Sequence, residues 1–329
     1  MHNSFLSRLA GRHEAYLGLL VVALALGLTL TTDEFFSLGN LTDVATSYAI
    51  LGILACGLFV VLIAGGIDIS FPAMTAIAQY VMASWIITHG GSFPLAFALA
   101  IAVGLLLGLC NGFLVYWLRV PAIIITIATL NLYYGLLVYL TKGTWLYGFP
   151  DWFMEGVNYF SFTASDGYDY GLTLPLLCLG GTIALTALLM NYTRLGRQIY
   201  AMGGNRDAAS RLGMNLLRLH FYVYGYMGIL AGVAAVVQAQ ITQSVAPNSL
   251  LGFELTVLAA VVLGGTSMSG GRGTLTGTLL GVILLAFLQN GLTLLGVSSY
   301  WHTVLSGVII LISISSTAWN EKRKLAKEL

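Results

Sequence analysis

The 329 residues of this chain are 58% hydrophobic and 8% charged, with a net charge of +1 and a mean hydropathy of +0.87. Soluble domains carry roughly a quarter charged residues, so this composition predicts an integral membrane protein and excludes a soluble fold. No basic patch interleaved with aromatic residues is present, which excludes nucleic acid as a partner. The three cysteines and five histidines lack the spacing of disulfides or metal ligands, so neither kind of site is expected.

The apolar runs predict about ten membrane spans, each long enough or nearly long enough to cross a bilayer. They lie at residues 16–30, 48–64, 74–87, 94–118, 122–140, 172–190, 221–239, 255–263, 274–288 and 300–314. The first follows two arginines but no small-residue cleavage pattern comes after it, so we expect a retained span with a cytoplasmic N-terminus.

The second predicted span ends in the sequence Gly-Gly-Ile-Asp-Ile-Ser-Phe-Pro at residues 65–72. Gly65 and Gly66 break the helix, and Ser70 is a candidate N-cap of the next one, where a proline is tolerated in the first turn. A break at membrane depth requires that protein or a water-filled cavity cover the backbone.

Asp68, within this break, is the only acid between Asp43 and Asp151. An intramembrane carboxylate is costly and marks a functional candidate, here in a translocation path or in ion coupling. The alternative is structural: Asp68 accepts hydrogen bonds from unpaired amides at the break. The donors of the adjacent turn favour the structural interpretation.

The fifth predicted span carries Thr126, Thr129 and Tyr133 on one helical face, with Asn131 beside them. Hydroxyls and aromatic rings together suit a sugar, whose hydroxyls need hydrogen bonds while its C–H faces stack on rings. The alternative is that these side chains bond neighbouring helices, as polar residues commonly do in membranes. Residues 141–171 then form a polar segment on the outer side, suited to a solute-binding protein or to an interfacial belt.

The most basic interruption of the chain is residues 191–220, whose arginines place it on the cytoplasmic side. Against the single acid Asp207, it carries Arg194, Arg197, Arg206, Arg211 and Arg218. Within it, Asn205 predicts the N-cap of a short helix that Gly213 ends. Ala208 and Ala209 give this helix a small-residue face that suits a docking partner, although it would also serve as a simple connection.

The run at 255–263 is too short to span alone and leads into a glycine-rich loop that begins at Gly264 and Gly265. A phosphate-binding loop is excluded, because Gly271 and Arg272 stand where Lys-Ser/Thr is required. An intramembrane serine protease would need Ser267 beside His302, and nothing in the sequence brings them together. A broken helix is the remaining interpretation.

Three stretches in this order, residues 65–72, 194–214 and 254–273, resemble the ribose-type ABC sugar importer permeases. Pro72 departs from the glycine usual in that family. The resemblance implies an all-α polytopic fold like that of the vitamin B12 and ribose importers, with residues 1–329 as one permease domain. It also implies a coupling loop at 191–220, a periplasmic segment at 141–171, both termini in the cytoplasm, and a bacterial inner membrane.

The resemblance further implies that a separate ABC ATPase binds the ATP and magnesium, and that this chain binds no cofactor. The other implied partners are a second permease copy or paralogue, a periplasmic solute-binding protein, the lipid membrane, and a small sugar or a sugar-like solute such as autoinducer-2. Contact with the ATPase would involve Arg197, Asn205, Asp207, Ala208, Ala209, Arg211 and Gly213. The translocation path would involve Asp68, Thr126, Thr129, Asn131 and Tyr133, with structural breaks at Gly65, Gly66, Gly264 and Gly265. The rival from another class is a self-sufficient ion-coupled carrier or channel.

Overall fold

The computed structural model describes residues 13–155, 158–163 and 169–298, with a few positions after residue 298. The N-terminal arginines, His302, most of the span predicted at 300–314 and the basic tail lie outside the described residues.

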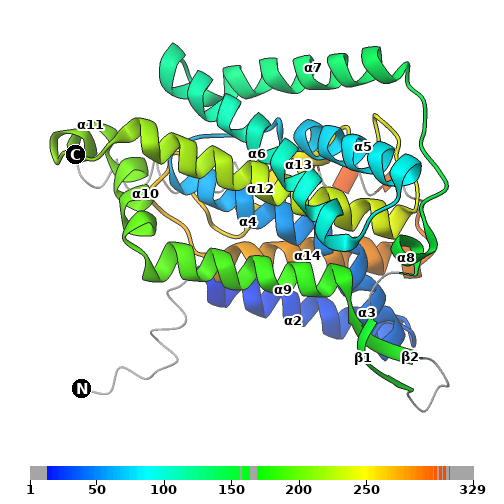
Figure 1. The fold of residues 1–329 in the computed structure, drawn as a ribbon. Coiled ribbons are helices and arrows are strands. Elements are labelled where there is room, and N and C mark those ends of the chain that lie inside the picture. The colour runs from blue at the N-terminus through cyan, green and yellow to red at the C-terminus, as the bar shows by residue number, and fades with distance from the viewer. Residues whose placement is uncertain are drawn as a thin grey trace, which may run out of the picture.

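Long helices lie side by side in one bundle (Figure 1). They are α2 (His13–Thr31), α3 (Leu38–Ser47), α4 (Ala49–Ile63), α5 (Phe71–His89), α6 (Phe93–Leu118), α7 (Ala122–Thr141), α9 (Leu174–Ala187), α12 (Leu216–Thr242), α13 (Phe253–Leu263) and α14 (Leu275–Leu294). The short elements are α8 (Asp151–Met154), the π-helix η1 (Leu188–Tyr192), α10 (Arg194–Gly204), α11 (Arg206–Arg211) and the strands β1 (Asn158–Thr163) and β2 (Asp169–Thr173).

In the part of the chain that the structure describes, 7 helices are long and apolar enough to cross a membrane, or 8 if the bent pair α3–α4 is one span. The predicted polytopic helical protein is thereby confirmed. Helix α13, with 11 residues, is as short as the sequence indicated. The antiparallel hairpin β1–β2 is a small departure from an all-α chain.

Polar segments occupy the two ends of the bundle. Helices α10 and α11 lie at one end, while α8 and the hairpin β1–β2 lie at the opposite end (Figure 1). The segments predicted for the two sides of the membrane, 191–220 and 141–171, are therefore separated by the length of the helices.

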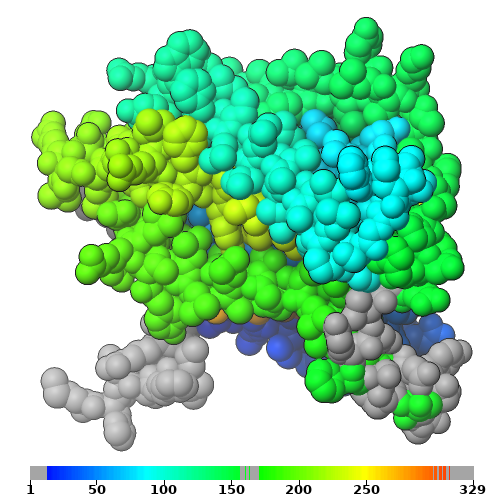
Figure 2. All heavy atoms as spheres, viewed as in Figure 1, coloured from blue at the N-terminus to red at the C-terminus, as the bar shows by residue number. Residues whose placement is uncertain are grey.

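The core centres on α4, in which every residue is buried. Helix α12 packs beside it and crosses α6 at very close range. A Cβ added at Gly104 of α6 would collide with the carbonyl oxygen of Gly228 on α12, and one at Gly108 would collide with that of Tyr224. Small residues four apart allow such backbone contact in membranes. Figure 2 shows the middle of α12 recessed between α6 and α9.

Candidate functional site

The short helix α11 forms as the sequence predicted. The Asn205 side chain caps it, since its Oδ1 accepts a hydrogen bond from the amide of Ala208 at 2.9 Å. Asp207 lies in the first turn, where a carboxylate suits the helix dipole. Gly213 follows the helix with φ +80°, a left-handed conformation that costs glycine little.

The surface that α11 offers differs from the predicted alanine face. Ala208 is exposed, but Ala209 is only 2% exposed and packs against the protein. The apolar side chain that does project is Leu212, which is 76% exposed. Arg197 and Arg211 are also exposed. Leu212 has no signal in the sequence, because the burial of Ala209, which places Leu212 outside, is not revealed by residue spacing.

The end of α10 touches both helix breaks through backbone atoms, at a cluster of glycines that we call the glycine junction: Gly65, Gly203, Gly204, Gly270 and Gly271. A Cβ added at Gly203 would collide with the carbonyl oxygen of Ile63, and one at Gly270 would lie 2.7 Å from the Cα of Gly65. One at Gly271 would lie 2.6 Å from the Cα of Gly204. At Gly203, Gly270 and Gly271 only glycine allows this approach.

Hydrogen bonds fix the glycine junction. The amide of Gly271, in the second break, donates to the carbonyl of Ile63 at 2.9 Å, which joins the end of α4 to the loop between α13 and α14. The Tyr200 hydroxyl of α10 donates to the carbonyl of Gly273 at 2.9 Å. Burial raises the pKa of Tyr200, so the hydroxyl keeps its proton. Helix α10 is thus bonded directly to the second break.

Asp68 lies in the first break and is 0% exposed. Its Oδ1 accepts hydrogen bonds from the amide of Ser70 at 2.8 Å and from the Ser70 hydroxyl at 2.6 Å. Its Oδ2 has no hydrogen-bond partner among the described residues. Ser70 does not cap α5 with its side chain, contrary to expectation, because its hydroxyl is engaged with Asp68.

A polar network extends from Ser70 to two further helices. Asn111 of α6 donates to the Ser70 hydroxyl at 2.6 Å, and the Tyr133 hydroxyl of α7 donates to Oδ1 of Asn111 at 3.0 Å. Thr126 donates to the carbonyl of Ile67 at 3.0 Å. The network therefore attaches α6 and α7 to the first break. Asn111 was missed in the sequence, because a lone asparagine in an apolar run gives no spacing signal.

The residues predicted to line a translocation path are arranged in two ways. Thr126, Thr129 and Tyr133 are buried, and their hydroxyls bond protein atoms of α6, α7 and the first break. Asn131 is exposed and its amide bonds the carbonyl of Ile127 in its own helix. Thr126 and Tyr133 thus bond neighbouring segments, whereas Thr129 and Asn131 bond their own helix, and a role in the path stays a prediction.

The second break begins at Gly264 and Gly265, the latter with φ +85°. Helix α2 is attached to this break. His13 forms a hydrogen bond with the carbonyl of Leu263 at 2.9 Å, and the Glu14 carboxylate accepts one from Thr276 at 3.2 Å. No sequence pattern connects His13 with this break, because its partner lies 250 positions away.

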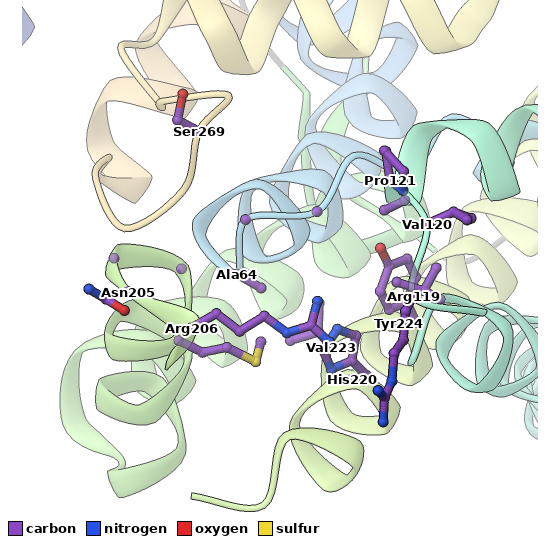
Figure 3. Close-up of a pocket in the computed structure, with 17 residues that line it drawn as sticks. Ala64, Arg119, Val120, Pro121, Asn205, Arg206, His220, Val223, Tyr224 and Ser269 are labelled. Carbon is purple, nitrogen blue, oxygen red and sulfur yellow. The ribbon is translucent and has the colours of Figure 1, made fainter. Parts of the chain in front are cut away.

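A cavity of about 420 Å³ opens beside the glycine junction (Figure 3). Its walls come from the first break, the α6–α7 turn, the α10–α11 connection and the start of α12. Three basic side chains line it, namely Arg119, Arg206 and His220, and no acidic side chain does. The loop, both breaks and this cavity form one continuous site at the end of the bundle.

Comparison with known proteins gives concordant results. The family model described as branched-chain amino acid transport system / permease component matches residues 40–314. The ribose import permease protein RbsC of Escherichia coli K12 is 35% identical over 295 residues, 90% of each chain. RbsC of Bacillus subtilis 168 is 34% identical over 91% of this chain and 90% of its own. The autoinducer 2 import system permease protein LsrC of Yersinia enterocolitica is 33% identical over 89% of this chain and 79% of its own. No solved structure matches the chain.

Proposed function

The chain belongs to the permease-component family of the branched-chain amino acid transport systems, and from this membership we propose that it forms the membrane path of an ATP-driven importer for a sugar or sugar-like solute. The names of its relatives support this solute class over amino acids. RbsC and LsrC are similar to it over nine-tenths of its length, and they are named for ribose and autoinducer 2.

The observation that carries the ATP-driven mechanism is the glycine junction. A separate ATPase would bind ATP and magnesium and would hold α11 by its exposed Leu212 and arginines. Gly203, at the connection between α10 and α11, contacts the carbonyl of Ile63 and lies against the second break. Rigid backbone contact transmits displacement better than flexible side chains do, since packed interfaces are not continuously deformable. Movement of α11 would therefore shift α4 and α13 together.

The remaining partners follow from the same proposal. A second permease, either a copy or a paralogue, would complete the path. A solute-binding protein would deliver the solute at the end of the bundle that carries α8 and the hairpin. The arginines of segment 191–220 favour the cytoplasm for α10 and α11 and, by parity of the spans, for both termini. The resemblance supports a bacterial inner membrane as the location.

The rival function is a carrier that couples transport to an ion without an ATPase. The observation in its favour is the buried, unpartnered Oδ2 of Asp68, because unpaired intramembrane carboxylates occur in ion pathways. Two hydrogen bonds from Ser70 to Oδ1 hold the carboxylate in place, however, and give it a structural role that needs no ion.

Replacement of one exposed leucine tests the proposal. Leu212→Glu should reduce ATPase association and solute import about tenfold or more, because a charge at the centre of an apolar docking contact is costly. Leu251→Glu is the matched control, since Leu251 is 67% exposed but lies in the turn between α12 and α13. It should leave association with the ATPase unchanged. Import into vesicles and co-purification of the ATPase are measured; undiminished import by the Leu212 variant would favour the self-sufficient carrier.

A further inference from the structure

The cavity beside the glycine junction has an uncompensated positive lining. Arg206 is the first residue of α11, Arg119 lies in the α6–α7 turn, and His220 lies in the second turn of α12. Figure 3 shows the Arg206 side chain reaching across the cavity toward His220 and Tyr224. Three segments far apart in the sequence thus contribute positive or potentially positive groups to one space. No carboxylate lines it to balance them.

Two buried polar groups face this cavity without full use of their hydrogen-bonding capacity. Tyr224 is 2% exposed, and its hydroxyl has no hydrogen-bond partner among the described residues. His220 is 6% exposed, and its Nδ1 bonds the carbonyl of Leu216 at 2.7 Å. Because a carbonyl only accepts, Nδ1 holds the proton, and Nε2 of the neutral ring remains as an acceptor for a hydroxyl of a ligand. A buried hydroxyl without a partner is destabilising, so a ligand that satisfies it is favoured.

The charges around Tyr224 single out an anion. The Arg206 side chain points toward both Tyr224 and His220 (Figure 3). Asp68 is fully buried and does not line the cavity. No carboxylate among the lining residues therefore neutralises the Arg206 guanidinium. A ligand there meets a guanidinium, an imidazole and a phenol hydroxyl.

We propose that this cavity, which we call the inner anion site, binds a molecule that carries a phosphate group. A guanidinium donates paired hydrogen bonds that match phosphate oxygens, and phosphate also accepts from a phenol hydroxyl. The volume of about 420 Å³ lies within the range of small-molecule sites and exceeds the needs of phosphate alone. The remaining space suits a group of the size of a monosaccharide. The ligand is a soluble phosphate ester or the head group of a phospholipid.

A ligand in the inner anion site would connect α11 with the helices of the bundle. Arg206 belongs to α11, whereas Arg119 and His220 belong to the bundle, so one anion would tie the coupling loop to the helices. Gly203 and Gly204 also line the cavity, which places the ligand against the glycine junction. The ligand would thus hold the loop in the arrangement described here. This consequence for transport rests on the proposed function, but the binding itself does not.

Binding to the purified full-length chain in detergent tests the site, with glucose 6-phosphate, inorganic phosphate and uncharged glucose as probes in calorimetry. Glucose 6-phosphate should bind and glucose should not. Arg206→Gln should weaken binding about tenfold, because it removes a charge-assisted hydrogen-bonded pair. Tyr224→Phe should weaken it by a smaller factor. Arg218→Gln is the matched control, since Arg218 is exposed in the same basic segment but does not line the cavity.

A second experiment distinguishes a phospholipid head group from a soluble phosphate ester as the ligand. The chain is placed in nanodiscs with and without phosphatidylglycerol, and retained lipid is measured by native mass spectrometry. Retention by the natural chain and the Arg218 variant, but not by the Arg206 variant, would identify a head group as the ligand. The proposal is overturned if neither probe class binds, or if the Arg206 and Arg218 substitutions weaken binding equally. Because no ATPase is present, these results do not depend on the importer mechanism.

Discussion

At the scale of single residues, the buried polar groups act as attachments between segments. Asn111 donates to Ser70 and accepts from Tyr133, so one side chain joins the first break, α6 and α7. It is 0% exposed. A complete network of such hydrogen bonds contributes modestly to the stability of a membrane protein. Loss of one side chain from the network, however, leaves several buried polar groups without a hydrogen-bond partner.

Replacement of this asparagine should therefore destabilise the protein. Asn111→Leu should lower the free energy of unfolding by about 1–3 kcal/mol, because Ser70 and Tyr133 each lose a partner. The thermal midpoint in detergent measures the effect. Asn131→Leu is the control: its amide bonds only its own helix and its side chain is exposed, so the midpoint should barely change. Equal shifts in both variants would contradict a special role for the network.

At the scale of elements, glycine determines which helices approach most closely. On α6 and α12 it permits a long crossing with touching backbones, and at the glycine junction it permits three chain segments to meet. Both cases depend on the absence of a Cβ, but the consequences differ. The crossing sets the architecture of the bundle, whereas the junction joins the coupling loop to the two breaks.

Neighbouring glycines allow a sharp test of the junction. A Cβ at Gly203 would collide with the carbonyl of Ile63, whereas a Cβ at Gly204 would meet nothing within 4 Å. Gly203→Ala should therefore force the segments apart, cost about 1–3 kcal/mol of stability and uncouple ATP hydrolysis from import. Gly204→Ala should leave stability the same or slightly higher, because alanine favours a helix. Hydrolysis and import are measured together in vesicles; full coupling in the Gly203 variant would refute the transmission path.

At the scale of the whole molecule, the bundle separates two functional ends. Helices α10 and α11 and the cavity beside the glycine junction lie at one end, and α8 and the hairpin lie at the other (Figure 1). The uneven distribution of arginine favours the cytoplasm for the first end. The proposed importer needs this polarity, because a separate ATPase and a solute-binding protein would act from opposite sides of the membrane.

Chemical labelling should reveal this polarity. A chain whose natural cysteines are replaced by serine receives either Leu212→Cys or Leu251→Cys, both at exposed positions near opposite ends of the bundle. A membrane-impermeant maleimide should label the Leu212→Cys variant only in inverted vesicles. It should label the Leu251→Cys variant only in right-side-out vesicles. Labelling of both from one side would contradict the orientation.

The local sequence determined the membrane class, most of the helices and the short coupling helix. Apolar runs predicted α5, α6 and α7 within a few residues of their observed ends, because hydrophobicity and length are properties of a continuous segment. Asn205 and Gly213 likewise predicted the limits of α11, since capping involves only nearby backbone groups. The glycine pairs predicted both breaks for the same local reason.

Only the tertiary structure decided what these segments contact. It buried Ala209 and exposed Leu212, engaged Ser70 with Asp68 instead of the helix end, and brought His13 to the second break. It also gathered Arg119, Arg206 and His220 around one cavity. The physical reason is that the local sequence around each residue does not indicate which other residue it contacts in the folded chain. Backbone contact at Gly203 depends on how three segments pack, and no single segment contains that information.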